Sequence, residues 1–117
     1  MHRPTILRHL QLAEESPLYL HRLDMRLWGR DLIFSCQAQN IPFRLIFSDC
    51  SDSRWRHYLH HEASPEAFLP SEILNFRIGR NQGRSPAQVL SEHFGLSLVY
   101  GDLFMEWGET RIALAEG

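Results

Sequence analysis

The sequence contains no lysine, so all twelve Lys+Arg positions are arginine. The planar guanidinium group suits bidentate contacts with carboxylates and phosphates. A chain-wide absence of lysine nevertheless fits a genomic codon preference better, because selection at one site would not remove lysine from the whole surface. The absence is therefore weak evidence about function.

Cysteines are few, and long apolar runs are absent. Cys36 and Cys50 are too few for a disulfide-stapled fold and too far apart for a CxxC motif. The uninterrupted apolar runs are only a few residues long, whereas a membrane-spanning helix needs about 20. Residues 1–9 contain no apolar stretch of signal-peptide length. We therefore expect a soluble cytoplasmic protein with reduced thiols.

The composition is typical of one globular domain. A length of 117 residues matches the usual domain size, and 44% hydrophobic with 22% charged residues argues against intrinsic disorder. The formal net charge is −2, so no overall positive field draws the protein to nucleic acid or membranes. We expect no membrane partner and consider nucleic acid unfavoured.

The first part of the chain has the pattern of a helix followed by strands. Apolar residues at helical spacing between Pro4 and Pro17 predict an N-terminal helical arm within residues 1–16. Over residues 18–48, apolar and polar residues alternate in three runs separated by short turns. Such short connections leave no room for a parallel crossover, so this segment is predicted to be an antiparallel meander.

The middle of the chain is less regular. Residues 49–72 are polar at first and then bracketed by prolines, which indicates an irregular or partly helical connection. Alternation over residues 73–80 predicts one strand.

A capping pattern predicts a helix over residues 85–95. Ser85 is a favourable N-cap, Pro86 suits the first helical position, and Gln88 completes a capping box. Gly95 is placed to end the helix in the left-handed conformation.

The last segment, residues 96–115, is predicted to be a second meander that turns at Gly101 and Gly108. Two meanders joined by a helical middle predict a single α+β domain. We expect about six to seven strands in one bent, mainly antiparallel sheet or a small open barrel, with two to three short helices.

Four residues that alternate cations with aromatic rings are candidates for an interface: Arg54, Trp55, Arg56 and Tyr58. These residue types are over-represented at protein interfaces, and a similar segment can grip phosphates while stacking a base. The alternative is that Trp55 packs in the core while the arginines pair with nearby aspartates.

The polar loop before the predicted helix is a candidate anion site. Arg80 and Arg84 precede Ser85, and a helix N-terminus there would offer backbone N–H donors to an anion. The loop has neither of the common glycine-motif spacings for phosphate, so a plain connecting loop is the alternative.

A weaker candidate is a metal site. If residues 54–62 were helical, His57 and His61 would share one face at the spacing that can hold zinc, with Glu62 or Asp49 as a third ligand. The glutamate of the zincin motif is absent, and histidines on a surface turn are the alternative. We therefore expect no metal and no cofactor.

Catalytic motifs are also missing from the sequence, which has neither a GxSxG elbow nor a catalytic-cysteine signature. We expect a small non-enzymatic protein-interaction module of bacterial type, such as a regulatory adaptor or a toxin-neutralising protein. Its partner would be another protein or a second copy of itself. The alternative is a ligand- or anion-binding domain that uses the arginine-bearing loop, and a histidine-based metal site ranks lower.

Overall fold

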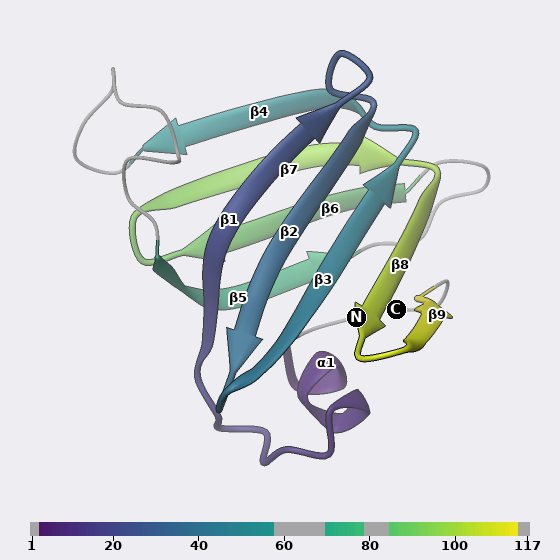
Figure 1. The fold of residues 1–117 in the computed structure, drawn as a ribbon. Helices are drawn as coiled ribbons and strands as arrows, with labels where there is room; N and C mark the ends of the chain where they lie inside the picture. The colour runs from purple at the N-terminus through teal and green to yellow at the C-terminus, as the bar shows by residue number, and fades with distance from the viewer. Residues whose placement is uncertain (1–2, 58–69, 79–84, 115–117) are drawn as a thin grey trace.

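Nine strands and one short helix make up the described part of the chain, which comprises residues 3–57, 70–78 and 85–114 of the computed structural model. The elements are drawn in Figure 1 and are, in chain order, α1 (Arg3–His9), β1 (Leu18–Arg26), β2 (Asp31–Ala38), β3 (Ile41–Ser48), β4 (Ser51–His57), β5 (Ser71–Ile78), β6 (Ser85–Ser91), β7 (Phe94–Tyr100), β8 (Asp102–Trp107) and β9 (Thr110–Ala113).

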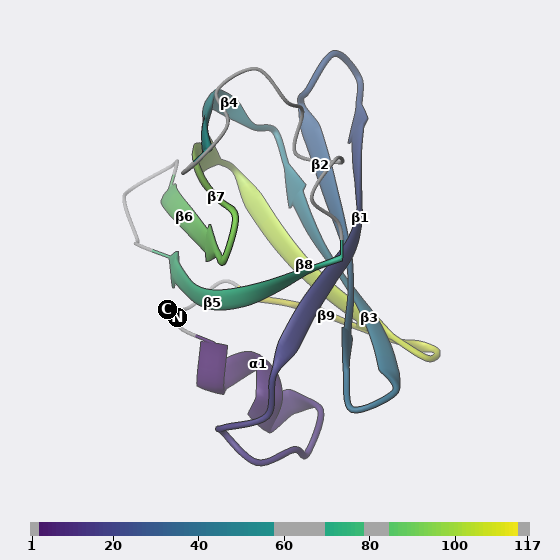
Figure 2. The ribbon, with the colours of Figure 1, turned by 90° about the vertical axis from the view of Figure 1, so that its left-hand side faces the viewer.

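The strands form one open antiparallel sheet in the order β4-β7-β6-β5-β1-β2-β3-β8-β9. Only three residue pairs join β1 to β5, between 18–20 and 71–73. On either side of this junction the sheet divides into a front layer (β1, β2, β3, β8, β9) and a back layer (β4 to β7), which Figure 2 shows edge-on.

The expected single domain with a mainly antiparallel sheet is confirmed, but the α+β class is wrong. The described residues are essentially all-β, with more strands than expected and α1 as their one helix. β1, β2 and β3 form an antiparallel meander over the residues where alternation predicts it. Gln39 and Asn40 turn the chain between β2 and β3 with φ values of 46° and 69°, as a tight hairpin requires.

Helix α1 is shorter than the predicted arm, and it covers the open end between the layers (Figure 2). Ile6 and Leu7 are fully buried there. The helix ends early because Gln11 adopts a left-handed φ of 60°. The Leu12 N–H then donates to the Leu7 carbonyl at 2.9 Å, which is the bond that closes a Schellman motif.

Residues 85–95, for which a helix is predicted, form β6 and the start of β7 instead. Burial alternates along β6, where Ala87, Val89 and Ser91 face the core. β6 is hydrogen-bonded to β5 on one side and to β7 on the other. The two partner strands and the burial of alternate side chains are tertiary interactions, and these override the local capping pattern here.

The turn between β6 and β7 is built around the Ser91 hydroxyl group. Its oxygen accepts the backbone N–H groups of His93 and Phe94 at 3.1 and 3.0 Å, and the hydroxyl donates to the Phe94 carbonyl at 3.2 Å. Ser91 is fully buried. A side chain that replaces backbone partners in this way stabilises a tight turn between two strands.

Two further expectations about connectivity are wrong. Within residues 49–72, for which an irregular or partly helical connection is predicted, Ser51–His57 is strand β4 at one edge of the sheet, and residues 58–69 lie outside the described residues. Residues 96–115 do not form a second meander, because β7 pairs with β6 and β4 whereas β8 pairs with β3 and β9. The strand expected at 73–80 corresponds to β5.

Gly101 is therefore the crossing point between the two layers rather than a hairpin turn. Its N–H donates to the Ser48 carbonyl at 2.9 Å. A Cβ atom at this position would lie 3.2 Å from both Cβ and Oδ2 of Asp49, closer than such contacts normally come. Glycine thus allows the chain to pass the end of β3 at close range.

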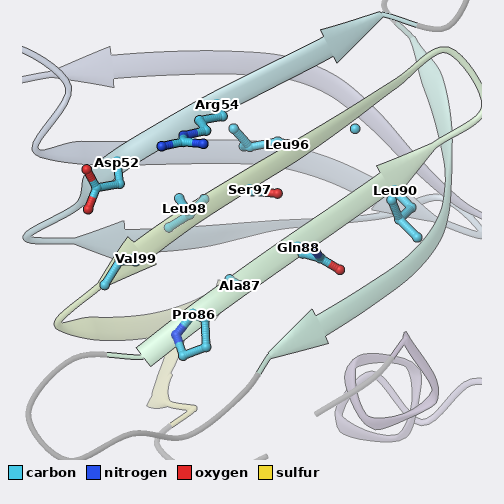
Figure 3. A pocket seen from close by; sticks show the side chains of 11 residues that line it. Asp52, Arg54, Pro86, Ala87, Gln88, Leu90, Leu96, Ser97, Leu98 and Val99 are labelled. Carbon is cyan, nitrogen blue, oxygen red and sulfur yellow. The ribbon is translucent and has the colours of Figure 1, made fainter.

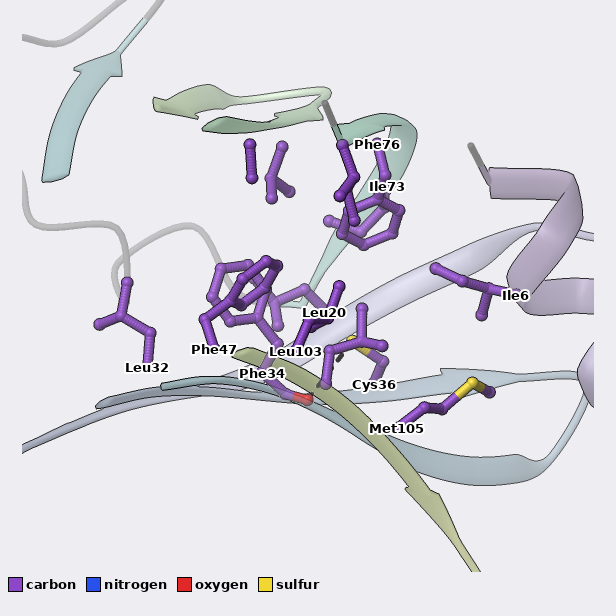
Figure 4. Close-up of a cluster of buried hydrophobic side chains, with 14 of the residues drawn as sticks. Ile6, Leu20, Leu32, Phe34, Cys36, Phe47, Ile73, Phe76, Leu103 and Met105 are labelled. Atoms are coloured by element: carbon purple, nitrogen blue, oxygen red, sulfur yellow. Dashed lines mark hydrogen bonds between the residues drawn. The ribbon is translucent and has the colours of Figure 1, made fainter. Parts of the chain in front are cut away.

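The hydrophobic core lies between the layers, with side chains from β1, β2, β3 and β8 meeting those from β5, and Ile6 closing one side (Figure 4). Phe47 on β3 links the layers. The centroid of its ring lies 5.4 Å from that of Phe34 and 5.3 Å from that of Tyr100 on β7. Both cysteines are buried, and neither forms a disulfide. Burial raises the pKa of the Cys36 thiol above its usual range, which keeps it unreactive.

On the outside of the front layer, Glu106 of β8 lies between two arginines. Arg44 of β3 donates a short hydrogen bond to its carboxylate, and Arg111 of β9 donates another at 3.1 Å. The hydrogen bond from Arg44 is the main reason that the pKa of Glu106 is lowered. The cluster ties β3 to the β8–β9 hairpin, which is distant from it in the sequence.

We expect the Glu106 cluster to make stability fall at acid pH. A carboxyl group whose pKa is lowered by folding stabilises the protein above its ordinary pKa of 4.5, and this contribution is lost as the pH falls through the folded-state value. Glu106→Gln should therefore reduce the loss of unfolding free energy between neutral and acid pH by about 1 kcal/mol. Urea denaturation of the wild type and the variant across this pH range measures how the free energy of unfolding depends on pH, with Glu109→Gln as the control. An identical pH dependence in the wild type and in Glu106→Gln would contradict the prediction.

Candidate functional site

The predicted interface residues fall at an edge of the sheet. Arg54, Trp55 and Arg56 belong to β4, while Tyr58 lies outside the described residues. Arg54 is exposed and stands opposite Ser97 of β7 in the strand register. The structure does not describe the side chains of Trp55 and Arg56. Of the four predicted interface residues, Arg54 is therefore the one whose side chain is placed.

The premise of the predicted anion site is wrong. Arg80 and Arg84 lie outside the described residues, and Ser85 begins a strand, so it cannot mark a helix N-terminus. The Ser85 side chain instead hydrogen-bonds Tyr100. Burial raises the pKa of Tyr100, and this bond partly opposes the rise.

The predicted metal site loses its geometric basis as well. His57 is the last residue of strand β4. The helix over residues 54–62 that would place His57 and His61 on one face is therefore absent from residues 54–57. His61 lies outside the described residues. Within the described ranges, no three His, Cys, Asp or Glu side chains come together in a group that could hold a metal ion.

Ser71, Glu92 and His93 come together near the β6–β7 turn, but their geometry is unsuited to catalysis. The Ser71 hydroxyl lies 3.0 Å from Nδ1 of His93, and the Glu92 carboxylate lies 3.8 Å from the same nitrogen. A catalytic triad needs the two imidazole nitrogens to serve different partners. Ser71 is also fully buried, so no substrate can reach it. We interpret this group as structural.

A furrow of about 800 Å³ runs along the outside of the back layer, over β4, β7 and β6 (Figure 3). The furrow dips over β7 because two of the outward-facing residues there, Gly95 and Ser97, are small. Arg54 forms one wall, and Gln88 with Leu90 forms the other. This outer furrow has a size typical of ligand sites and combines apolar, amide and cationic groups.

The apex of the β1–β2 hairpin presents large apolar side chains to solvent. Trp28 is fully exposed (103%), and Leu27 is 64% exposed. Met25, near the end of β1, is 50% exposed. Burial of such groups normally contributes about 1.5–3 kcal/mol each, so two of them left together at a loop tip give up a stabilisation that a covering partner would supply.

The apex backbone is strained as well. Leu27, Trp28 and Gly29 have φ values of 53°, 61° and 86° in succession. This left-handed region suits glycine, but a bulky side chain there costs about 1 kcal/mol. The sequence thus keeps leucine and tryptophan at two positions where asparagine or glycine would be more favourable for the fold.

Hydrogen bonds nevertheless brace the apex. The Gly29 N–H donates to the Arg26 carbonyl and the Arg30 N–H to the Leu27 carbonyl, both at 3.1 Å. Arg30 then joins the loop to the β3–β4 turn, because its carbonyl accepts the Cys50 N–H at 2.7 Å. Its side chain also pairs with Asp49 at 3.4 Å. Trp28 is therefore presented on a braced loop.

Reasoning from the sequence places a turn at this hairpin but misses Leu27 and Trp28 as functional candidates. The signal that could have identified them is two large apolar residues directly before the turn glycine, where Asn, Asp, Ser or Gly is usual.

Comparison with known proteins adds information on the fold. No protein-family model and no curated protein matches the chain. An uncharacterized protein from Neisseria gonorrhoeae has a similar crystal structure, with a TM-score of 0.59 at 12% sequence identity; the match covers 77% of this chain and 90% of that one. At this identity the likeness concerns the fold alone. In the described residues, no helix is long and apolar enough to cross a membrane.

Proposed function

We propose that the protein is a small, cytoplasmic, non-enzymatic interaction module that binds another protein through the apex of its β1–β2 hairpin. The observation that carries the proposal is the fully exposed Trp28 on a strained but braced loop. A regulatory adaptor and a toxin-neutralising protein both fit this description, since each acts by covering a partner's surface.

The apex has the properties of an interface anchor. Tryptophan and arginine are the residue types most enriched among the side chains that dominate binding energy, and Trp28 lies between Arg26 and Arg30. Because the loop is held by backbone hydrogen bonds, little conformational freedom is lost when a partner binds. Strained backbone that persists at an exposed site is also more common at functional positions than elsewhere.

We expect Trp28→Asn to weaken partner binding at least 30-fold, which corresponds to about 2 kcal/mol for an anchoring residue. The same change should leave stability unaltered or raise it by about 0.5 kcal/mol, since asparagine tolerates a left-handed φ. Loss of binding in a variant that is at least as stable cannot be attributed to misfolding.

The experiment has two stages. Immobilised wild-type protein captures partners from an extract of the source cells, and the affinity of the recovered partner is then measured by titration calorimetry. Leu74→Ala is the matched control, because Leu74 is also an exposed apolar residue (52%) but lies on β5 of the back layer. Size-exclusion chromatography tests whether the partner is a second copy. Binding that survives Trp28→Asn, or that is lost equally in Leu74→Ala, would refute the proposal.

A further inference from the structure

A second surface carries unneutralised positive charge. Among the arginines whose side chains are described, five form ion pairs with carboxylates, and three do not: Arg26, Arg54 and Arg77. Arg54 lines the outer furrow, and Arg77 lines the adjoining hollow beside Gln88. The furrow thus lies between two guanidinium groups that have no carboxylate partner within the described chain.

The strand register places these two arginines on one line across the back layer. Arg54 stands opposite Ser97, Ser97 opposite Gln88, and Gln88 opposite Arg77. All four lie on the outer face, since the alternate positions on β6 and β7 are buried. Three inter-strand steps of about 4.8 Å separate the arginines by about 14 Å.

The surface between the arginines suits an extended chain. The floor at Gly95 and Ser97 is low, and Leu90 and Val99 add apolar contacts on either side of the row. The hydroxyl of Ser97 and the amide of Gln88 can both donate and accept hydrogen bonds. An extended peptide covers about 3.4 Å per residue, so about four residues span the distance between the backbone positions of the two arginines.

We infer that the outer furrow binds an extended acidic peptide segment, laid across the strands from Arg54 to Arg77. Its two carboxylates are four residues apart, and the residue midway between them faces Ser97 and Gln88. In an extended chain, residues i, i+2 and i+4 share one face, so this spacing brings both carboxylates to the protein at once.

A peptide fits the furrow better than a polyanion does. The rim also carries Asp52, and the chain as a whole has a net charge of −2, which opposes the close approach of a phosphate backbone. Two localised carboxylates match the two arginines in number, and they bring less negative charge near that aspartate than a run of phosphates does. The inference uses none of the apex residues, so it stands or falls separately from the proposed function.

The test uses a phage-displayed library of linear peptides, roughly twelve residues long, selected against the intact protein. We expect the selected sequences to share two acidic residues at i and i+4. A synthetic peptide with that consensus should bind at least tenfold more weakly to Arg54→Gln and to Arg77→Gln, and with unchanged affinity to Arg26→Gln. In the wild type, binding should shift the amide resonances of Gly95 and Ser97.

Four results would overturn the inference: no selection of peptides, a consensus without paired acids, an affinity for Arg54→Gln and Arg77→Gln equal to that for the wild type, or binding lost only in Trp28→Asn. Inorganic phosphate and a short single-stranded oligonucleotide are tested as competitors. If either displaces the peptide at micromolar concentration, the site is a general anion site and the peptide assignment is wrong.

Discussion

Replacing Phe47 with alanine is expected to lower the free energy of unfolding by about 4 kcal/mol. Phe47 is fully buried and makes tilted or edge-on ring contacts with Phe34 in its own layer and with Tyr100 in the back layer. Alanine would leave a cavity and remove both contacts, each of which adds about 0.5–1.5 kcal/mol beyond simple burial. A domain of this size has only about 5–15 kcal/mol of stability in total.

The loss should be specific to the position that joins the layers. Phe104→Ala is the matched control, because Phe104 on β8 is only half-buried and lies under Arg111 on the outer face. We expect it to cost about 1 kcal/mol. Urea denaturation followed by tryptophan fluorescence measures both variants. A cost for Phe47→Ala no larger than that for Phe104→Ala would mean that the contact between the layers contributes little to stability.

Ser91→Ala is expected to destabilise the protein by about 2–3 kcal/mol, although it removes a single oxygen atom. The Ser91 hydroxyl accepts the N–H of Phe94 at a buried position and the N–H of His93 at a partly buried one. Alanine leaves these donors without that acceptor, and a buried donor without a partner costs about 1–3 kcal/mol.

The control for Ser91→Ala is the same substitution at Ser97, which faces the outer furrow. There we expect a change within about 0.5 kcal/mol, because water can replace the hydroxyl group. Thermal unfolding by circular dichroism compares the two variants directly. If their unfolding temperatures are equal, the serine-centred turn does not hold β6 and β7 together as we describe.

The part of the fold that follows from local sequence is the meander over residues 18–48. Its strands are adjacent in the chain, and alternation alone decides which side chains face the core. The helix predicted over residues 85–95 fails for a physical reason that local rules do not contain. Ser85, Pro86 and Gln88 satisfy the capping pattern, but partners on both sides of β6 are supplied by distant strands.

The error at Gly101 has the same origin. A glycine followed by an aspartate predicts a turn equally well whether the chain folds back on itself or crosses to another layer. Which of the two occurs depends on the edge of β3 being free to pair with β8, and that pairing is non-local.

The two candidate surfaces differ in how far the sequence could have identified them. Arg54 was among the predicted interface residues, but its alignment with Arg77 depends on three strand registers that no local pattern specifies. Leu27 and Trp28, in contrast, could have been identified from the local sequence alone, because large apolar residues are unusual at the tip of a hairpin. Arg80, Arg84, Tyr58 and His61 remain untested predictions.

The interleaved order of the strands has a consequence for how the chain folds as the ribosome makes it. β3 pairs with β8, and the Arg44–Glu106 contact spans 62 residues. The β1–β3 meander therefore emerges with the β3 edge bare, and this edge stays without its partner while the whole back layer is synthesised. Contacts this distant in sequence slow folding, and a bare strand edge is a template for aggregation. The nascent chain should be most dependent on chaperones in the interval before residues 102–107 leave the exit tunnel.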